Sequence, residues 1–273
     1  MTKSKFSLWP RQKGGNTSGN APKIDNRRKH VERNGQQRGY AVCTLPRSGS
    51  NFFCDILTTT GVLGNPREFF NTEARRMYDD PTYPEDRFAQ IERILTMGAT
   101  DNGVYAMKIF PGLHDLIAPT LRWTVELPNL SFVRFRREDV LGQAISWVRS
   151  GQTRQFRSSE PVVGETHYDG PAIAGYVRKI CQRNARWEMY FTRTGIQPLD
   201  VSYEGFMADP TGTVQKIASL MNVEFNDTID LSKSRFKKQR TDENAVWRER
   251  FISEYGDRDD IDPFWEPADQ ARG

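Results

Sequence analysis

Two short polar segments carry the residue types that bind phosphate-like anions. The first is "PRSGS" (residues 46–50). Its Arg47 offers a permanent positive charge, and Ser48 and Ser50 offer hydroxyl donors. Gly49 has no Cβ, so the backbone can approach an anion closely there. The Walker A spacing with its lysine is absent from the segment. The segment predicts an anion-binding turn; the alternative is a Ser/Gly helix cap beside a surface arginine.

The second polar segment is "RFRREDVLGQAIS" (residues 134–146), which has three arginines at the end of a predicted strand. Asp139 is suited to cap the helix that follows. Arg137 and Ser146 lie on the same general flank, where they could bind another phosphate, and Arg136 is an alternative to Arg137. A charged strand end before a solvated helix is the simpler interpretation. The two segments together favour a nucleotide with phosphate groups at two positions.

Strand patterns alternate with helix patterns around these segments, which predicts an α/β fold with a parallel sheet covered on both faces. Short apolar runs predict strands at residues 39–44, 103–110, 130–135 and within "IQPLDVSYE", ending at Tyr203. Helical spacing predicts helices at residues 51–60, 85–97, 138–150, 172–194 and 210–222. Ligands bind beyond the carboxyl ends of such strands, so we expect both polar segments at one edge of the sheet.

The basic excess of the chain lies in its first residues. Residues 1–38 contain ten of the 39 Lys and Arg residues but two of the 35 Asp and Glu residues, so the remainder is mildly acidic. This segment is polar and without periodicity, which predicts a disordered basic N-terminal tail. The alternative is a basic arm for nucleic acid or anionic lipid. Residues 39–273 are long enough for a single domain with a well-buried core.

Other classes of protein are disfavoured by what the sequence lacks. No run approaches eighteen apolar residues, and no apolar segment follows the N-terminal lysines, so we expect neither a membrane span nor a secretory signal. Cys43, Cys54 and Cys181 form no C-x-x-C pair, which predicts reduced thiols in a cytoplasmic protein. The three histidines are widely spaced, and no metal site is expected.

Three motifs resemble those of the bacterial trehalose sulfotransferase family: "PRSGSNFF", "TTTGVLGNPREFF" and "RREDVLGQAISWVRSGQTR". The family patterns are close to QRSGST, GxPxEFF and RPDVVxQAVSxWxxxQTR. The resemblance extends from about Tyr40 to near residue 251. It implies a P-loop-like, three-layer α/β/α fold and a single sulfotransferase domain at residues 39–273. It also implies that the co-substrate is 3′-phosphoadenosine-5′-phosphosulfate (PAPS), released as PAP, and that no metal is needed.

The resemblance implies roles for individual residues. Those that match the family's 5′-phosphosulfate loop are Arg47, Ser48, Gly49 and Ser50, and Asn51 follows them as a further cofactor-binding residue. Arg137 and Ser146 match the element that holds the 3′-phosphate. Glu68 matches the family's proposed catalytic carboxylate.

Further family positions follow along the chain. Lys108 is one of them, and we group it with the catalytic residues. Others are Gln152, Thr153 and Arg154. Gln239 and the cofactor-binding candidate Arg240 resemble a C-terminal segment that closes over the nucleotide.

The chain departs from the family pattern at three places. Pro46 replaces Gln before the loop arginine and removes one backbone donor. Glu138 replaces Pro and brings a negative charge beside Arg137. The stretch "DENAVW" (residues 242–247) is longer than the family's "DEW", so the position of Arg240 could shift by one turn.

Sulfuryl transfer to a hydroxyl depends on positioning and charge stabilisation, as phosphoryl transfer does. Arg47 is expected to stabilise the leaving phosphate oxygen. Glu68 is the candidate general base, and its neighbours Phe69 and Phe70 are expected to raise its pKa toward the working pH. The simpler interpretation of Glu68 is a surface carboxylate paired with Arg67.

The predicted function is therefore sulfuryl transfer from PAPS to a hydroxyl of a carbohydrate or glycolipid. One alternative is a P-loop-like kinase that uses ATP and Mg²⁺, and another is a non-catalytic protein that binds a nucleotide or nucleic acid. For the sulfotransferase we expect no nucleic-acid partner, and the resemblance allows a homodimer. Residues 151–171 are rich in Gly, Pro, Ser and Thr, and are either a mobile loop near the acceptor or an ordinary surface connection.

Overall fold

The computed structural model describes residues 37–157, 160–236, 242–257, 259 and 261–262. The predicted basic tail lies outside the described residues up to residue 36, but its last residue, Arg38, belongs to the first strand of the sheet. Gln239 and Arg240 also lie outside the described residues.

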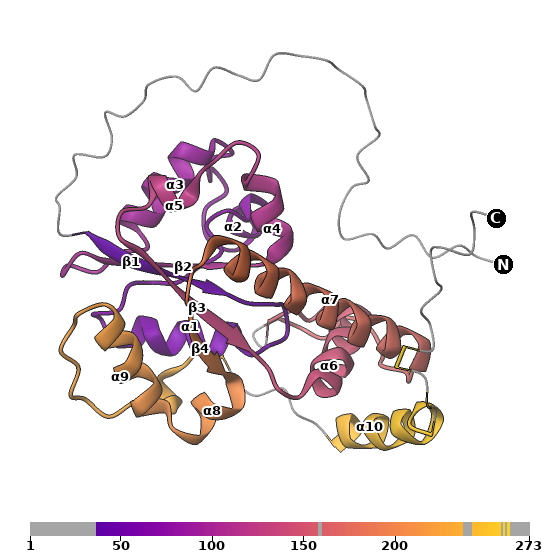
Figure 1. The fold of residues 1–273 in the computed structure, drawn as a ribbon. Coiled ribbons are helices and arrows are strands. Elements are labelled where there is room, and N and C mark those ends of the chain that lie inside the picture. Colours follow the sequence, from indigo (N-terminus) through magenta and orange to yellow (C-terminus); the bar gives the residue numbers. More distant parts are fainter. Residues whose placement is uncertain (1–36, 158–159, 237–241, 258, 260, 263–273) are drawn as a thin grey trace, which may run out of the picture. The chain divides into compact units, whose positions relative to one another are not determined.

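A parallel sheet forms the centre of the described structure (Figure 1). Its strands are β1 (Arg38–Cys43), β2 (Val104–Ile109), β3 (Leu130–Arg136) and β4 (Leu199–Ser202). They lie in the order β2-β1-β3-β4, and each neighbouring pair is parallel. These are the four strands that the sequence predicts. The last is shorter than expected because Pro198 has no N–H for a ladder hydrogen bond and because Ser202 already caps the next helix.

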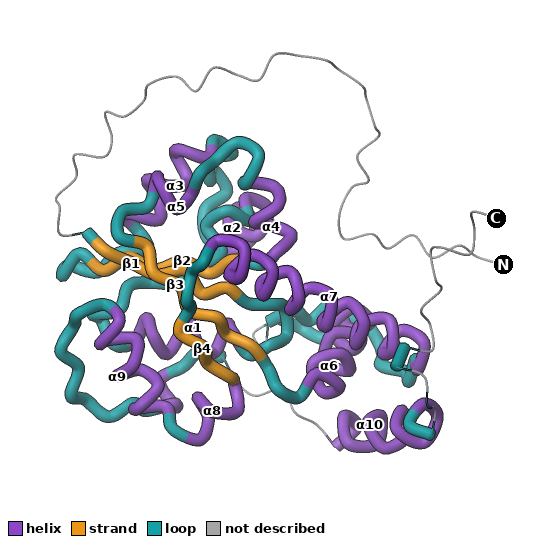
Figure 2. Tube along the Cα trace, viewed as in Figure 1, coloured by secondary structure: helices purple, strands orange, loops and turns teal. Residues whose placement is uncertain are grey.

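Helices cover both faces of the sheet, as Figure 2 shows. Alternate residues of β1 reach opposite layers. Tyr40 and Val42 pack with the helices beneath the sheet in this view, whereas Ala41 and Cys43 pack with those above it. Both clusters consist largely of fully buried side chains. The predicted three-layer α/β/α architecture, typical of P-loop-like folds, is confirmed.

The predicted helices are present with shifted ends. They are α1 (Ser50–Thr59), α3 (Arg87–Thr96), α6 (Val140–Thr153), α7 (Gly170–Thr194) and α9 (Pro210–Leu220). The sequence patterns missed α2 (Thr72–Tyr78), α4 (Pro111–Ile117), α5 (Trp123–Glu126), α8 (Tyr203–Ala208), the short 3-10 helix η2 (Leu231–Lys233) and α10 (Asp242–Tyr255). The missed helices are short or lack an apolar stripe, so local periodicity does not identify them. In α10, for example, the one buried residue is Trp247.

The strand order creates a switch point between β1 and β3. From β1 the chain passes to β2 on one side, and later to β3 on the other side. The loops that leave the carboxyl ends of β1 and β3 therefore separate, which is where ligands bind in open α/β sheets. The register pairs Cys43 with Arg134, so these two strand ends lie side by side. Both predicted polar segments begin here.

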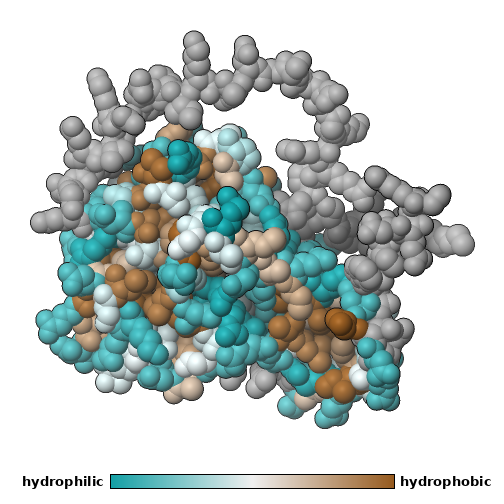
Figure 3. Space-filling model, viewed as in Figure 1, coloured by the Kyte–Doolittle hydropathy of each residue, from teal (hydrophilic) through white to brown (hydrophobic). Residues whose placement is uncertain are grey.

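The surface of the described residues is mixed in polarity. Figure 3 shows hydrophilic and hydrophobic residues interspersed over the face that it draws. Within the described part of the chain, no helix has the length and apolar character that a bilayer crossing requires.

Candidate active site

The loop that follows β1, together with the first residue of α1 (residues 44–50), is called the anion loop below. Gly49 caps α1 with a left-handed backbone (φ 88°), and a Cβ there would lie 2.5 Å from the ring of Tyr203. Only glycine satisfies both constraints. Arg47 also has a positive φ of 62°, which is uncommon for a residue with a side chain and typical of functional loops. The two reasons for Gly49 differ from the one that the sequence suggested, the close approach of an anion, which stays a prediction.

Side chains from three elements hold the anion loop in shape. The Ser48 hydroxyl is buried and donates to the Leu45 carbonyl at 2.8 Å. From α6, the Gln143 amide donates to the Pro46 carbonyl at 2.8 Å. From α7, the indole of Trp187 donates to Thr44 at 3.2 Å. Because the Ser48 hydroxyl is engaged within the loop, the donors that suit an anion here are the first N–H groups of α1, which no helical carbonyl accepts, and the Ser50 hydroxyl.

The two predicted polar segments meet through a direct contact. Arg47 donates from Nε to the Ser146 hydroxyl at 3.1 Å, across 99 positions of sequence. Its Nη1 also donates to the Phe156 carbonyl at 2.7 Å. Ser146 belongs to α6, the helix that follows β3. The arginine of the first segment and the serine of the second therefore line one site.

Three arginines, Arg47, Arg137 and Arg149, crowd this end of the sheet and are called the arginine cluster below. Burial, together with the charges of Arg137 and Arg149, lowers the pKa of Arg47 to about 10. Arg47 remains charged at neutral pH, but the repulsion destabilises it. An anion bound between these side chains would relieve the repulsion. Arg149 was not identified from the sequence, because nothing in its neighbourhood distinguishes it from a surface arginine on α6.

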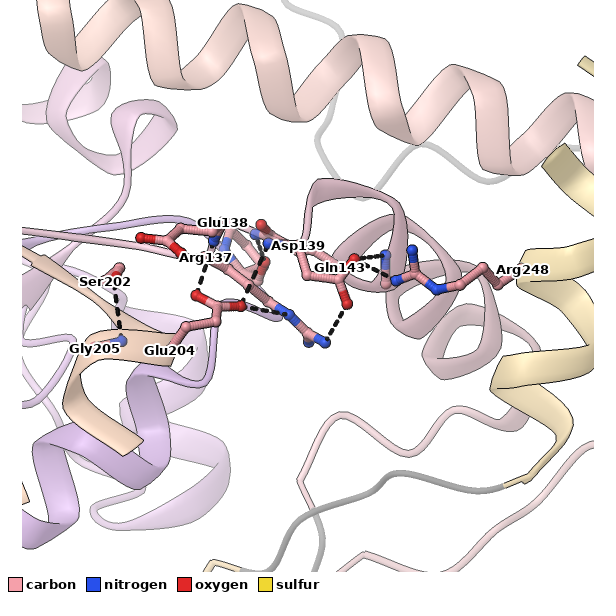
Figure 4. A network of polar contacts seen from close by, with 10 residues as sticks. Arg137, Glu138, Asp139, Gln143, Ser202, Glu204, Gly205 and Arg248 are labelled. Carbon is pink, nitrogen blue, oxygen red and sulfur yellow. Dashed lines mark hydrogen bonds and ion pairs between the residues drawn. The ribbon is translucent and has the colours of Figure 1, made fainter. Parts of the chain in front are cut away.

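Acidic side chains hold Arg137 in place (Figure 4). Its Nη2 lies 3.3 Å from a carboxylate oxygen of Asp139, and its Nε lies 3.9 Å from Glu204. The Glu204 carboxylate also accepts hydrogen bonds from the backbone N–H groups of Glu138 and Asp139. The guanidinium carbon lies 5.7 Å from the centre of the Tyr203 ring, the same ring that faces Gly49. Arg137 is therefore positioned against the anion loop.

Asp139 links this network to the C-terminal helix. As predicted, it caps α6 by accepting a hydrogen bond from Gly142 N–H at 2.9 Å. It also pairs with Arg248 of α10, which reaches it from the opposite side to Arg137 (Figure 4). Burial alone would raise the pKa of Asp139, but hydrogen bonds from Arg248 and Gly142 and the charge of Arg137 lower it.

Arg136 and Arg137, which the sequence left as alternatives, have different surroundings. Arg136 pairs with Asp200 at 3.5 Å and with Glu138 at 3.9 Å, and 40% of its side chain is exposed. The Arg137 side chain is 17% exposed and contributes to the low pKa of Arg47. The environment of Arg137 is thus the one that suits a phosphate.

Glu68 lies beside β2, where Arg67 forms a parallel bridge with Met107. Lys108 lies on the same face of β2 as Val104 and Ala106, which pack in the cluster that contains α1. Its ammonium donates a hydrogen bond to the side-chain oxygen of Asn51 in α1. The same ammonium forms a 2.9 Å ion pair with Glu68. Asn71 donates to the other Glu68 oxygen at 2.7 Å. The structure thus brings together three predicted site residues: Glu68, Lys108 and Asn51.

The prediction that the pKa of Glu68 is raised is wrong, because the pKa is lowered. Burial raises it, but the charge of Lys108 and the hydrogen bonds from Asn71 and Lys108 outweigh burial, so the pKa is lowered. Phe69 and Phe70 belong to the hydrophobic core. The simpler interpretation of Glu68, a surface carboxylate paired with Arg67, is wrong as well. Among the described residues, Arg67 pairs with Asp79 at 3.9 Å and not with Glu68.

A pocket opens beside the Glu68–Lys108 pair and is called the polar pocket below. The residues that line it include Asn51, Glu68, Arg75, Lys108, Arg157 and Arg235. Charged side chains make up much of the lining, so the pocket suits a polar ligand. Arg75 and Arg157 were not singled out from the sequence, since α2 has no apolar stripe and Arg157 lies in a polar loop.

The remaining predictions have varied outcomes. Gln152 binds the backbone of His167 at 2.9 Å, and Thr153 and Arg154 end α6. Gln152 and the Thr153 carbonyl, which accepts the Val163 N–H at 3.0 Å, support the segment that leads to α7. Cys43 and Cys54 are buried free thiols, whereas Cys181 is exposed.

Comparison with known proteins identifies the family. The profile of the Stf0 sulphotransferase family matches residues 39–254. A trehalose 2-sulfotransferase of Mycobacterium tuberculosis is 25% identical over 260 residues, covering 80% of this chain and 95% of that protein. Its counterpart from Mycolicibacterium smegmatis is 25% identical over 257 residues, covering 78% and 93%.

Solved structures show a more distant similarity. The sulfotransferase domain from the Curacin biosynthetic pathway has a TM-score of 0.45 and 11% identity, and the match covers 81% of this chain and 98% of that one. Mouse sulfotransferase SULT7A1 complexed with PAP has a TM-score of 0.42 and 13% identity, with 81% and 67% covered. Because the family profile spans most of the sequence, including both polar segments, the chain belongs to the Stf0 sulphotransferase family and is a sulfotransferase.

Proposed function

We propose that the protein transfers a sulfuryl group from PAPS to a hydroxyl of a carbohydrate or glycolipid acceptor. The observation that carries the proposal is the contact between Arg47 and Ser146 within the arginine cluster, because it joins the two segments that suit two separate phosphate groups. The names of the relatives, which specify trehalose, favour a carbohydrate acceptor.

On the donor side, the anion loop and Arg47 would bind the 5′-phosphosulfate, and Arg137 and Ser146 would bind the 3′-phosphate. Cationic side chains that repel one another gain stability when an anion lies between them. Helix α1 begins at the loop and adds the partial positive charge of its N-terminus. Asn51 would orient Lys108 toward the same group.

In the reaction, the acceptor oxygen forms a bond to sulfur while the bond from sulfur to the 5′-phosphate oxygen breaks. The electron pair of the broken bond stays on the phosphate, and PAP leaves. Arg47 would stabilise the negative charge that develops on that oxygen. The acceptor proton moves to the Glu68 carboxylate, which is ionised at neutral pH because its pKa is lowered.

Lys108 has two parts in this scheme. Its ion pair keeps Glu68 ionised and oriented before the reaction. An ammonium at this position would also attract the sulfuryl oxygens. A shift of Lys108 away from Glu68 toward those oxygens would raise the basicity of the carboxylate when a proton has to be accepted.

Thermal unfolding of the full chain with PAP, compared with ATP and Mg²⁺, tests the donor. At a hundredfold excess over Kd a ligand stabilises the folded state by about 2.7 kcal/mol, which corresponds to roughly 5–10 °C for a domain of this size. We expect a shift with PAP that is lost in Arg47→Ala. A shift with ATP and Mg²⁺ alone would support the kinase alternative, and no shift with either would contradict the proposal.

The domain boundaries are part of the proposal. We infer a single PAPS-dependent sulfotransferase domain at residues 39–273, to which the structure adds Arg38 as the first residue of β1. This domain does not need the residues before position 37. The test therefore removes residues 1–36 and keeps all of β1. This deletion should leave PAP binding unchanged, whereas a nucleic-acid-binding protein would lose its salt-dependent binding. The cytoplasmic location, the homodimer and the absence of a metal or nucleic-acid partner stay predictions from the sequence.

A further inference from the structure

The polar pocket contains more positive charge than its own acidic groups neutralise. Two of its pairs cancel: Lys108 with Glu68 at 2.9 Å, and Arg235 with Asp55 at 2.8 Å. The remaining charged residues of the lining are three arginines, Arg67, Arg75 and Arg157, and one aspartate, Asp79.

Asp79 is shared between two of these arginines. It forms an ion pair with Arg75 one helical turn away and lies 3.9 Å from Arg67. Glu160 is the other acid in the neighbourhood, and it accepts the backbone N–H of Arg157 at 2.8 Å. With Glu160 counted, three positive charges still face two negative charges.

Arg75 carries an unsatisfied donor in this pocket. Its side chain is 8% exposed, and its Nε is buried without a hydrogen-bond partner among the described residues. A buried N–H without an acceptor is costly, and such groups usually indicate a missing partner. Burial lowers the pKa of Arg75 despite Asp79 and Glu68, and the charges of Arg157 and Arg67 lower it further. A bound oxyanion would accept a hydrogen bond from Arg75 and would offset the excess positive charge around it.

Arg157 is held in a way that suits such a ligand. Its guanidinium lies over the Tyr78 ring, 3.4 Å from the ring centre. Tyr78 is fixed in turn by a hydrogen bond of 2.5 Å to Glu160. Stacking uses the face of the guanidinium, and the N–H groups along its edge keep the geometry that binds an oxyanion in a bidentate way.

We propose that the acceptor is anionic: a hydroxylated molecule that already carries a phosphate, sulfate or carboxylate group, which Arg157 and Arg75 bind in the polar pocket. The inference rests on the proposed function, because Glu68 in the same pocket must face the hydroxyl. It distinguishes this chain from a protein whose acceptor is trehalose, which is uncharged.

Matched sugars test the acceptor class. Trehalose is compared with trehalose 6-phosphate, and glucose with glucose 6-phosphate, by calorimetric titration of the full chain both without and with saturating PAP. We expect the phosphorylated member of at least one pair to bind at least tenfold more tightly. If neither phosphorylated sugar binds more tightly than its parent, the proposal is wrong. PAP binding is read separately, so a chain that discriminates the sugars but ignores PAP would contradict the proposed function alone.

Two arginine variants locate the effect. Arg157→Gln should reduce the preference for the phosphorylated sugar to less than threefold while PAP affinity stays the same. Arg76→Gln is the matched control, because Arg76 belongs to the same helix as Arg75 but pairs with the exposed Glu85 at 2.8 Å. It should keep the full preference. A preference that survives Arg157→Gln would show that the phosphate binds elsewhere and would overturn the proposal.

Discussion

The arginine cluster and the polar pocket differ in how their charges are arranged. Arg47 and Arg137 follow two adjacent strands at the switch point, and burial together with the charge of Arg137 lowers the pKa of Arg47. In the polar pocket, Lys108 and Glu68 already neutralise each other. The first site is prepared for a strongly charged ligand, whereas the second is prepared for a proton transfer. This division suits a reaction in which the first site holds the phosphates of the donor. The second site then takes a proton from the acceptor hydroxyl, while its surplus arginines bind the anionic group of the acceptor.

The largest expected effect concerns the polar pocket. Glu68→Gln keeps the size of the side chain but removes the base, and we expect kcat to fall by about 10²- to 10⁴-fold. PAP affinity should stay within twofold, because Glu68 belongs to the acceptor half. The value of kcat is measured by the release of PAP from PAPS with a saturating acceptor, and PAP affinity is measured by calorimetry. A loss of PAP affinity as large as the loss of kcat would mean that the polar pocket and the arginine cluster are not separate sites.

The next effect concerns the arginine cluster. Arg137→Met removes a charge-assisted contact worth about 2 kcal/mol, so PAP should bind about 30-fold more weakly. Arg136→Met is the matched control, because Arg136 faces Asp200 and should change PAP affinity by less than about twofold. The opposite ranking of these two variants would assign the 3′-phosphate to Arg136.

A smaller effect concerns pH. The Lys108 ion pair contributes to the low pKa of Glu68, so loss of activity in acid should occur below the ordinary range of a glutamate, where the carboxylate becomes protonated. Lys108→Met removes that contribution while burial still raises the pKa, so the acidic limb of kcat/KM should move to higher pH. A limb that stays in place would show that another group controls it.

The smallest effect tests the link between the arginine cluster and α10. Asp139→Asn keeps a good helix cap but loses the charge that holds Arg137 and Arg248. We expect a three- to tenfold loss of PAP affinity and a loss of about 1 kcal/mol in the free energy of unfolding at pH 7.

The pH dependence of that variant provides its control. Because the pKa of Asp139 is lowered in the folded state, its contribution is present above the unfolded pKa and is lost as pH falls through the folded pKa. The difference in the free energy of unfolding between wild type and Asp139→Asn should therefore shrink in acid. A difference that is independent of pH would mean that the cap, and not the charge, stabilises the helix.

The meeting of Arg47 and Ser146 could be predicted because both follow parallel strands, and parallel strands end at the same edge of a sheet. The helix α10 could not be predicted in the same way. It buries Trp247 and attaches through polar contacts to Asp139 and Arg149. Those contacts leave no apolar period in the sequence.

Sequence neighbours were a poor guide to the environment of Glu68. Phe69 and Phe70 flank it in the chain but belong to the hydrophobic core, and the ion pair with Lys108 outweighs the effect of burial on its pKa. Lys108, 40 positions away, reaches it because β2 runs beside the segment that contains Glu68. Local sequence therefore gave the pKa of Glu68 the wrong direction. The family resemblance, and not the neighbouring residues, is what singles out this carboxylate.

The sequence by itself determined the strands, the caps and the glycine of the anion loop, because these depend on backbone conformation and on the spacing of apolar residues within a few positions. The tertiary structure alone decided which charges meet: Arg149 beside Arg47, Lys108 against Glu68, and Arg157 on Tyr78. Electrostatic interactions act over distance in space and not along the chain, so pKa values and ligand charge depend on the fold that brings these side chains together.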